Sequence, residues 1–452
     1  MRIAELRGKR VAIWGFGREG RAALAALRQQ HPAQPFTLFC AAAEVDAARA
    51  FDPALDVIGS EPDSAALARF EVVLKSPGIS AYKPALLAAQ AQGVAVTSGT
   101  ALWFAQNPQA RVIAVTGTKG KSTTSAMLAH LARALGVRTA LAGNIGLPLL
   151  ELDGQQADLW VIELSSFQTG EAGPLELGVI TSLYEEHLDW HGSRERYVED
   201  KLKLADVAGQ LLISALQPML LERTREHPHR LLFGHPHGWH VANGWIRRGD
   251  QEVFPLDQLA APGLHNALNA CAALAALAAV GMDALAAASA LATFRPLPHR
   301  LQPLGQHDGR DWINDSISTT PLATLAALQS VQGRAVSVLV GGHDRGLDWT
   351  PFVQAVRKAP PHAIVCMGAN GGRIAEALRG ADVACPLALV DQLADAVVEA
   401  KTLTPAGGVI LLSPGAPSFD QFRDYAQRGS RFAELAGFDE VGSVGIEGVG
   451  IR

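Results

Sequence analysis

The sequence predicts an α/β protein of three domains built on parallel sheets. Short runs rich in β-branched and aromatic residues alternate with Ala- and Leu-rich segments of helical length, which is the pattern of strands joined by crossover helices. A content of 48% hydrophobic and 18% charged residues is that of a globular chain able to bury several cores. The length of 452 residues agrees with a prior of about three domains.

The first part of the chain is expected to be Rossmann-like. "RVAIWG" (10–15) predicts a strand and 17–31 the helix after it, and "EVVLKSPGI" (71–79) predicts another strand that ends in a Pro-Gly turn. The turn "GFGREG" (15–20) fits the GxGxxG pattern, which alone would favour an NAD-dependent oxidoreductase. The position where such proteins carry a ribose-binding acid falls near Cys40, which argues against that interpretation.

The middle part begins with the strand "ARVIAVTG" (110–117), which runs into a lysine-rich loop and a helix over 122–136. Further strands are expected at 157–164 and 177–183. The segment "HNALNACAALAALAAVG" (265–281) predicts a strongly apolar, buried helix. Together these elements predict a central domain with a parallel sheet.

A linker is expected at "FRPLPHRLQPLG" (294–305), because its three prolines break the helical pattern. After it come three strand-like runs that end in glycine, which predict a C-terminal Rossmann-like domain: 334–342, 362–368 and 407–415. The predicted domains are 1–108, 109–295 and 296–452.

Composition excludes several classes of function. A net charge of −5 argues against a nucleic-acid or anionic-membrane surface. The four cysteines are far apart with no CxxC pair, which favours free thiols in a reducing cytoplasm over disulfides or a zinc site. No uninterrupted apolar stretch of about 18 residues predicts a membrane span, and the N-terminus does not have the pattern of a signal peptide. A cytoplasmic enzyme or binding protein is expected.

The stretch "AVTGTKGKSTT" (114–124) predicts a phosphate-binding loop. A strand that ends in glycines and opens a helix aims several backbone N–H groups and the helix dipole at one point. Lys121 can reach terminal phosphates, and the Ser122 hydroxyl can ligate the accompanying Mg²⁺. Val115 stands where the usual loop has its first glycine, so a shorter loop is expected; a plain strand–turn–helix with a lysine-rich tip is the less favoured alternative. The residues assigned to ATP here are Gly117, Thr118, Lys119, Gly120, Lys121, Ser122 and Thr123.

This loop belongs to an ordered set of motifs that resembles the Mur ligases, ATP-dependent amide-bond-forming enzymes that build the peptide stem of bacterial cell-wall precursors. The set spans most of the chain: "TGTKGKSTT", "AGNIGLPLL", "ELSSFQ", "GLHNALNACAAL", "LPHRLQ", "NDSISTT" and "LLSPGAPSFDQF". The resemblance implies an N-terminal UDP-binding domain, a central P-loop-type ATPase domain and a C-terminal domain for the incoming amino acid. It also implies UDP-N-acetylmuramoyl-L-alanine and glutamate as the substrates, and peptidoglycan synthesis in the cytoplasm by a monomer.

The residues and the resemblance together predict a magnesium centre. Glu163 emerges where a parallel strand stops, so its carboxylate can share Mg²⁺ with Ser122 and the ATP phosphates. The family places a magnesium-binding histidine at the position of His187, which alone would be read as a structural histidine. It places a carbamylated lysine at Lys201, whose carbamate supports a second Mg²⁺, where a solvated helix lysine is the plain alternative. Lys121, His187 and Lys201 are the expected catalytic residues.

The family also assigns the binding residues. The UDP-sugar substrate is expected to contact the turns of the first domain and polar groups near Glu163: Gly15, Phe16, Gly17, Arg18, Ser76, Pro77, Gly78, Asn144, Ser165, Ser166 and Gln168. Asn266 and Asn269 share one face of an otherwise apolar helix, where two amides need partners. The resemblance implies ATP for both amides and for Arg300 and Asp315.

The incoming amino acid is expected to contact Thr319, Arg345, Ser418 and Tyr425 in the last domain. Arg345 can grip a side-chain carboxylate with a bidentate fork. The D-glutamate-adding pattern of the family has lysines at the positions of Arg345 and Ile317 and a phenylalanine at Tyr425. These departures favour the L-glutamate-adding branch, with D-glutamate as the alternative.

Three other classes of protein remain as alternatives. A folylpolyglutamate synthetase-like ligase shares the nucleotide apparatus but lacks a UDP-binding unit, which "GFGREG" supplies here. A non-catalytic nucleotide-binding module would not need Glu163, His187 and Lys201 beside the loop. An NAD-dependent oxidoreductase ranks low because the stronger phosphate loop lies about a hundred residues after the first glycine turn.

Overall fold

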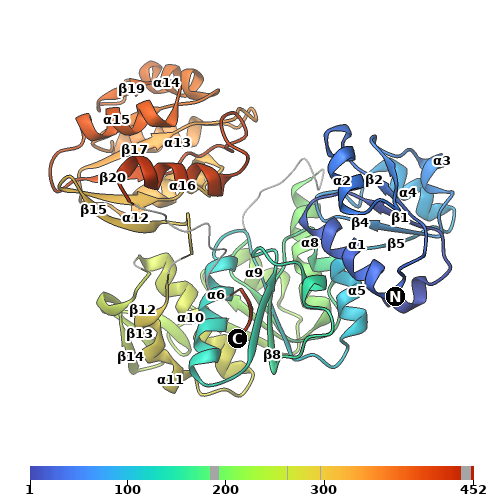
Figure 1. The fold of residues 1–452 in the computed structure, drawn as a ribbon. Coiled ribbons are helices and arrows are strands. Elements are labelled where there is room, and N and C mark those ends of the chain that lie inside the picture. The colour runs from blue at the N-terminus through green and yellow to red at the C-terminus, as the bar shows by residue number, and fades with distance from the viewer. Residues whose placement is uncertain (184–192, 262, 296, 439–448) are drawn as a thin grey trace. The chain divides into compact units, whose positions relative to one another are not determined.

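The computed structural model describes residues 1–183, 193–261, 263–295, 297–438 and 449–452. The chain forms two compact units, Met1–Phe294 with Gly448–Arg452, and Arg295–Glu447. The first unit contains two sheets and the second contains one (Figure 1). Within the described ranges, no helix is long and apolar enough to cross a bilayer.

The first sheet has five parallel strands in the order β3-β2-β1-β4-β5. Their order reverses beside β1, which creates a crevice at the carboxyl ends of the central strands. The strands are β1 (Val11–Trp14), β2 (Phe36–Phe39), β3 (Asp56–Ile58), β4 (Val72–Lys75) and β5 (Ala95–Thr97). The helices that join them are α1 (Arg18–Gln30), α2 (Val45–Phe51), α3 (Ser64–Leu67) and α4 (Pro84–Ala91), and α5 (Gly99–Gln106) follows β5 and leads to the second sheet.

The second sheet has ten strands in the order β14-β13-β12-β11-β10-β9-β6-β8-β7-β21. The run from β12 to β7 is parallel, and antiparallel pairs flank it at both ends. The strands are β6 (Val112–Thr116), β7 (Thr139–Gly143), β8 (Leu159–Glu163), β9 (Leu175–Ile180), β10 (Ala208–Ser214), β11 (Arg230–Phe233), β12 (Trp239–Ala242), β13 (Trp245–Arg248), β14 (Gln251–Pro255) and β21 (Gly450–Ile451).

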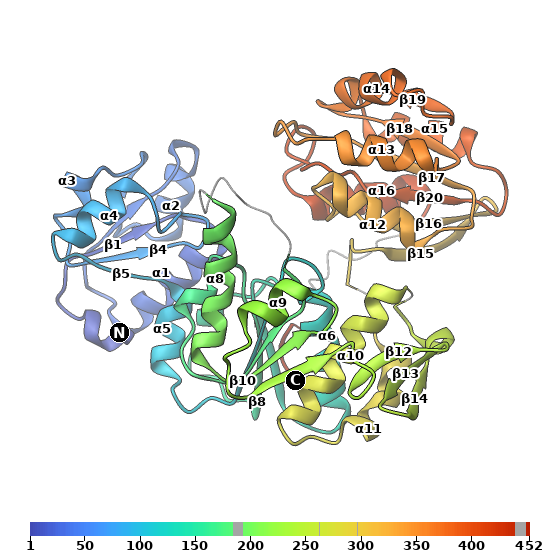
Figure 2. The same cartoon turned by 180° about the vertical axis from the view of Figure 1, so that it is seen from behind.

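Two helices pack together on this sheet and deliver polar side chains to the loop after β6. Figures 1 and 2 show α6 (Lys121–Ala134) beside α10 (Leu264–Ala279). Alanines make up half or more of the buried face of α10, so the two helix backbones can approach closely. The other helices of this part are α8 (Arg194–Val207), α9 (Pro218–Arg223) and α11 (Ala284–Ala287), with the short 3₁₀ helix η4 (Thr169–Glu171).

The second unit is a six-stranded sheet in the order β15-β16-β20-β17-β18-β19, parallel except for the β15–β16 hairpin. Apolar side chains bury both of its faces. The strands are β15 (Gln302–His307), β16 (Arg310–Asn314), β17 (Val336–Val340), β18 (Ala363–Cys366), β19 (Leu387–Leu389) and β20 (Val409–Leu412). The helices are α12 (Pro321–Ser330), α13 (Thr350–Lys358), α14 (Gly371–Gly380), α15 (Leu393–Leu403) and α16 (Tyr425–Ala436).

Two observations differ from the sequence-based expectations. The segment 294–305 is only partly a linker, because β15 begins at Gln302 and pairs with β16. Gly450 and Ile451, which the sequence grouped with 296–452, pair antiparallel with β7 in the first unit. The division into domains 1–108, 109–295 and 296–452 stays a prediction.

Candidate functional site

The lysine-rich loop lies between β6 and α6 and has a backbone that only glycine adopts easily. Gly117 has φ +148° and Gly120, the N-cap of α6, has φ +86°. A Cβ at Gly117 would lie 2.0 Å from Thr181 Oγ1, and one at Gly120 would lie 2.5 Å from Asn269 Oδ1. The loop is therefore packed tightly against the end of β9 and against α10, with the first N–H groups of α6 directed outwards.

Hydrogen bonds from neighbouring segments fix this loop in place. The backbone N–H of Thr118 donates to Ser182 O at 2.9 Å, and that of Lys119 donates to Ser182 Oγ at 2.9 Å. The Thr181 hydroxyl donates to Lys119 O at 2.6 Å. The side chains of Ser122 and Thr123 are buried at the start of α6, whereas Lys121 is half-buried and Lys119 is exposed.

Asn269 and Asn266 lie at the loop, as their shared helix face predicts. The Asn269 Nδ2 amide donates to Asn266 Oδ1 at 3.4 Å, and Thr124 Oγ1 donates to Asn269 Oδ1 at 3.3 Å. Thr124 is on α6, so these contacts join α10 to the helix that the loop opens. Each asparagine is 9% exposed, and Asn269 is the nearest neighbour of Gly120 across the gap between the helices.

Lys201 on α8 reaches the same loop from the other side. Its ammonium donates to Gly117 O at 3.1 Å and lies 3.4 Å from Thr116 Oγ1, and its side chain is 2% exposed. Thr116 Oγ1 in turn donates to Leu164 O at 2.8 Å. The plain alternative of a solvated helix lysine is therefore wrong for Lys201, whereas its neighbour Lys203 is an ion-pair partner of Asp200 at 2.6 Å.

Glu163 is the last residue of β8 and is fully buried. Its Oε1 accepts a hydrogen bond from Asn144 Nδ2 at 2.8 Å, and among the described residues its Oε2 has no hydrogen-bond partner. Parallel pairing places Glu163 beside Val115, two residues before the loop. A buried carboxylate oxygen without a donor is costly unless a cation or a water binds it, so this atom fits a metal ligand.

The other metal ligands that the sequence predicts are not all described. His187 lies outside the described residues, as do its acidic neighbours. In the described part of the chain, no group of three or more His, Cys, Asp and Glu side chains could hold a metal. Glu163, with Ser122 and Lys201 at the loop, is the portion of the predicted magnesium centre that the structure describes.

A pocket of about 560 Å³ opens where turns of the first sheet meet strand ends of the second. Ten of the eleven predicted UDP-substrate residues line it; Ser166 does not. The sequence did not predict seven further lining residues: Glu19, Glu44, Ile79, Gly143, Gly146, Pro148 and Phe167. Glu44 could have been found from the sequence, because it is an acidic residue that follows β2 by only a few residues. The sequence-based expectation placed such an acid near Cys40, which is slightly too early in the chain.

The first-sheet wall of this pocket is made by two glycine turns in close contact. Gly15 has φ +102°, and a Cβ there would lie 2.7 Å from Ser76 Oγ. Arg18 at the start of α1 donates to Gly146 O at 3.0 Å, which joins this turn to the loop after β7. The N-terminus of α1 and the Arg18 guanidinium give this wall a positive potential that suits an anionic group.

Glu19, which lines the pocket, lies close to a second half-buried carboxylate, Glu171. Burial and the nearby carboxylate of Glu171 raise the pKa of Glu19 to about 7. Glu171 itself pairs with the buried Lys75 at 2.9 Å and accepts from Ser98 Oγ at 2.6 Å. Lys75 therefore has a structural partner, and the Gln168 side chain donates to Thr100 Oγ1 at 3.1 Å beside it.

In the second unit, Asp315 is buried and is the centre of a hydrogen-bond network. Its carboxylate accepts from the Leu301 N–H at 3.0 Å, Ser318 Oγ at 2.5 Å and Ser413 Oγ at 2.8 Å. Burial raises the pKa of Asp315, and these hydrogen bonds and the Arg300 charge oppose that rise. The network holds together three segments that carry predicted ligand residues.

The predicted amino-acid residues lie around the carboxyl ends of β16, β17 and β20. Arg345 is exposed, and its guanidinium lies 5.9 Å from the centre of the Phe419 ring. Ser418 is buried, Thr319 is half-buried, and Tyr425 begins α16 with its ring edge against His299. Three of these residues lie in loops and Tyr425 lies at the start of α16, all at the sheet edge where ligand sites of parallel α/β sheets are found.

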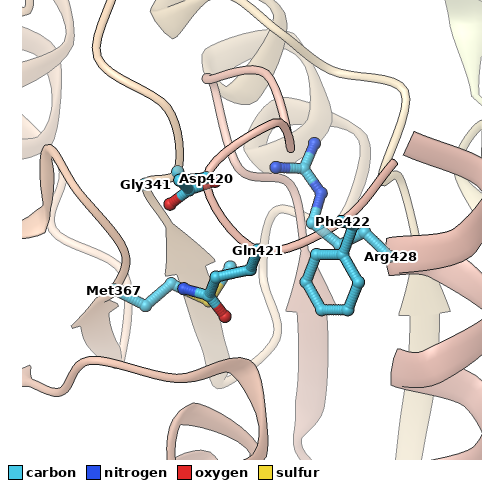
Figure 3. A pocket seen from close by; sticks show the side chains of 7 residues that line it. Gly341, Met367, Asp420, Gln421, Phe422 and Arg428 are labelled. Carbon is cyan, nitrogen blue, oxygen red and sulfur yellow. The ribbon is translucent and has the colours of Figure 1, made fainter. Parts of the chain in front are cut away.

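Arg428 is a buried arginine, in hydrogen-bond contact with the loops that carry the proposed amino-acid residues, that sequence reasoning missed. It is 1% exposed, and it donates to Ser316 Oγ at 3.0 Å, Ser316 O at 2.8 Å and Ala416 O at 3.0 Å. It borders a small cavity of about 10 Å³, room for about one water molecule, with Gly341, Gly342, Met367, Asp420, Gln421 and Phe422 (Figure 3). Its Nη1 has no hydrogen-bond partner among the described residues. The sequence could have indicated this burial, because Arg428 lies four residues before Phe432 and therefore on the apolar face of α16.

The chain matches the family described as "Mur ligase middle domain" over residues 115–277. A protein of Xanthomonas campestris pv. campestris (strain 8004) named UDP-N-acetylmuramoyl-L-alanine–L-glutamate ligase is 51% identical, with 100% of both chains covered. Among solved structures, the UDP-N-acetylmuramate–alanine ligase of Thermotoga maritima has a TM-score of 0.60 at 19% identity, covering 94% of this chain and 98% of that one. Mycobacterium tuberculosis folylpolyglutamate synthase complexed with ADP has a TM-score of 0.57 at 16% identity, covering 75% and 93%. The two solved structures share the fold with this chain.

Proposed function

This chain belongs to the Mur ligase family, and we propose that it uses ATP to join L-glutamate to UDP-N-acetylmuramoyl-L-alanine in peptidoglycan precursor synthesis. The observation that carries the proposal is the pocket of about 560 Å³, because Asn144 lines it and also donates to Glu163. A substrate in this pocket would have one end beside the strand that leads into the phosphate loop. The name of the 51% identical relative supports the same pair of substrates.

The reaction requires the alanine carboxylate to be activated, because its leaving group would otherwise be oxide. A carboxylate oxygen attacks the γ-phosphorus of ATP, the bond to the bridging oxygen breaks, and ADP leaves. The amine of glutamate then attacks the acyl carbon, loses a proton, and displaces phosphate with the electron pair of the C–O bond. The products are the amide, ADP and phosphate. Both steps need in-line positioning and the exclusion of water.

Residues 117–123 are proposed to hold the ATP phosphates through the Lys121 ammonium and the backbone N–H groups of residues 120–123, since those of Thr118 and Lys119 donate to Ser182. Mg²⁺ bound there would neutralise charge that builds up as the phosphoryl group transfers. Ser122 and Glu163 are the proposed ligands, supported by the buried Glu163 Oε2, which accepts no hydrogen bond from a described residue. His187 is proposed from the family resemblance alone.

Lys201 is proposed to carry a carbamate and to support a second Mg²⁺. The modification forms when the uncharged amine attacks CO₂ and loses a proton, which converts a cation into an anion. Its buried position beside Thr116 and Gly117 supports this assignment, because a carbamate there would face the phosphate loop and could share a Mg²⁺ with phosphates bound to it. Activity that rises with bicarbonate, together with a ¹³C carbamate signal that is lost in Lys201→Arg, is expected. Full activity in CO₂-free buffer with no such signal would refute it.

The second unit is proposed to present the amino acid through Thr319, Arg345, Ser418 and Tyr425, with Arg345 binding the side-chain carboxylate. Asn266, Asn269, Arg300 and Asp315 are proposed to contact ATP. L-glutamate is preferred over D-glutamate because Ile317 and Arg345 replace two lysines of the D-glutamate pattern, and because the relative is named for L-glutamate. We also propose a cytoplasmic monomer, which light scattering on the purified protein would test.

The deciding experiment measures phosphate release and product mass with ATP, Mg²⁺, UDP-N-acetylmuramoyl-L-alanine and each glutamate enantiomer. Release is expected only when L-glutamate and the UDP-sugar are both present, and Lys121→Ala should lower it by at least about 100-fold. Turnover of D-glutamate alone would reverse the assignment of the enantiomer. Turnover of a folate in place of the UDP-sugar would establish the folylpolyglutamate alternative.

A further inference from the structure

The last described strand of the chain, β21, covers an open edge of the ten-stranded sheet. It pairs antiparallel with β7, Gly450 opposite Leu141 and Ile451 opposite Ala140. The N–H of Thr139 donates to Arg452 O at 2.8 Å, and the N–H of Arg452 donates to Thr139 O at 3.3 Å. Without β21, β7 would be an edge strand with one side of its backbone unpaired, which is a strand prone to fray.

Arg133, near the end of α6, holds the two strands together. Its Nη2 donates to Gly450 O at 2.9 Å and to Thr139 O at 2.7 Å, and its Nε donates to Thr139 O at 3.2 Å. One planar guanidinium therefore joins α6, β7 and β21, a geometry that lysine cannot reproduce. The side chain is half-buried, so these three bonds are partly shielded from water.

β7 is also the strand that delivers the pocket residue Asn144. The strand ends at Gly143, and Gly143, Asn144 and Gly146 line the pocket. The backbone N–H of Asn144 donates to Glu163 O at 2.9 Å, and its side chain donates to Glu163 Oε1 at 2.8 Å. A Cβ at Gly143 would lie 2.3 Å from Glu163 O, so β7 and β8 tolerate little displacement at this point. Movement of β7 would move Asn144 away from Glu163.

We propose that β21, clamped by Arg133, is a positioning element for substrate binding: it fixes β7 and so holds the Asn144 amide in the pocket and against Glu163. The inference rests on the proposed function, in that the pocket takes the UDP-sugar substrate.

Four variants of the full protein, including Arg133→Lys, test this proposal, with one matched control. Deletion of residues 449–452 removes β21, and Arg133→Ala removes the clamp. Gly450→Ala strains β21 alone, because Gly450 has φ +99° and no heavy atom within 4 Å of the added Cβ. Arg138→Ala is the control, since this arginine lies beside the same α6–β7 turn but donates to Gln156 O instead of β21.

The readouts are amide hydrogen exchange over 139–146 and the three KM values. Deletion and Arg133→Ala should raise exchange in this segment and raise KM for UDP-N-acetylmuramoyl-L-alanine about tenfold, with KM for ATP changed less than about twofold. Gly450→Ala should show the same pattern more weakly, Arg133→Lys should recover part of the loss, and Arg138→Ala should resemble the wild type.

Either of two results would overturn the proposal. One is wild-type exchange and KM values in the deletion variant. The other is a uniform loss of kcat and all three affinities with a lower Tm and no local rise in exchange, which would mean that β21 only stabilises the fold. If the wild type fails to ligate these substrates, the proposed function fails, while exchange over 139–146 still decides whether β21 fixes β7.

Discussion

Glu19 shows how one residue can make the pocket sensitive to pH. Its carboxyl group is held next to Glu171 at a pocket wall whose positive potential suits the diphosphate of the proposed UDP-sugar substrate, and its pKa is raised to about 7 by burial first and by that neighbour second. An ionised Glu19 would repel a diphosphate, whereas the protonated group can donate a hydrogen bond to it. Affinity for the UDP-sugar should therefore fall as the pH rises through about 7.

Stability should follow the same titration. Because the folded pKa of about 7 lies above the ordinary glutamate value of 4.5, the folded protein holds this proton more tightly than the unfolded chain. The contribution of this proton to the free energy of unfolding is complete below pH 4.5, and it is lost as the pH rises to about 7. Glu19→Gln should therefore gain stability relative to the wild type across this range, by about 1–3 kcal/mol.

Calorimetric titration of the UDP-sugar between pH 5.5 and about 8.5, with denaturant unfolding at the same pH values, measures both effects. Glu19→Gln should bind with little pH dependence over this range. Glu44→Gln is the matched control, because Glu44 lines the same pocket and accepts the Ala41 N–H at 3.1 Å. If Glu19→Gln kept the wild-type pH profile, the titration would have to be assigned to another group.

Two features of the phosphate loop require glycine: neighbouring atoms leave no room for a Cβ, and the backbone has a positive φ. Gly117→Ala would place a Cβ 2.0 Å from Thr181 Oγ1 at φ +148°, so the loop must move away from β9. Binding of an ATP analogue with Mg²⁺ should weaken at least about 30-fold, since the N–H groups would no longer converge. Fluorescence titration with a labelled ATP analogue measures it.

Gly136→Ala is the matched control for this loop, because Gly136 ends α6 at φ +79° with no heavy atom within 4 Å of the added Cβ. It should lower stability by about 1 kcal/mol through backbone strain and leave nucleotide binding unchanged. Equal losses of binding in the two variants would mean that general destabilisation, and not the geometry of the loop, explains the effect.

Elements whose signals are local were predictable from the sequence. Strand β6, its glycine loop and helix α6 lie within 110–136, and the periodic apolar pattern of α10 marks its buried face. Each of these has its cause in neighbouring residues: a turn that needs glycine, a helix period or a run of β-branched side chains. Ten of the eleven residues proposed for the UDP substrate line one pocket, because parallel strands end at one edge of a sheet; their role in binding stays a prediction.

Elements that depend on distant partners were not predictable in this way. β21 has two residues, and nothing in "VGIR" identifies β7, more than three hundred residues earlier, as its partner. The hairpin β15–β16 uses part of a proline-rich segment that local rules assign to a linker. Arg428 and Glu19 depend on burial created by the whole fold, so their roles emerge only from three-dimensional contacts.

At the scale of the whole molecule, the two units have separate hydrophobic cores. One set of buried clusters lies within residues 3–220, and two others lie within 301–438. The phosphate loop belongs to the first unit, and the proposed amino-acid residues belong to the second. Each core can therefore respond to its own ligand, because a ligand stabilises the unit that binds it by mass action.

Equilibrium unfolding in denaturant should consequently show two transitions. The variant with Trp312→Phe and Trp349→Phe keeps tryptophans only in the first unit. Its tryptophan fluorescence should therefore report the unfolding of the first unit alone, while circular dichroism reports the unfolding of both units. An ATP analogue with Mg²⁺ at about 100 times its Kd should stabilise the unfolding transition of the first unit by about 2.7 kcal/mol, and that of the second unit by less, through the proposed ATP contacts of Arg300 and Asp315. Coincident transitions that shift together with the nucleotide would show instead that the units unfold as one, which would mean that the energy linking the two units exceeds the difference between their stabilities.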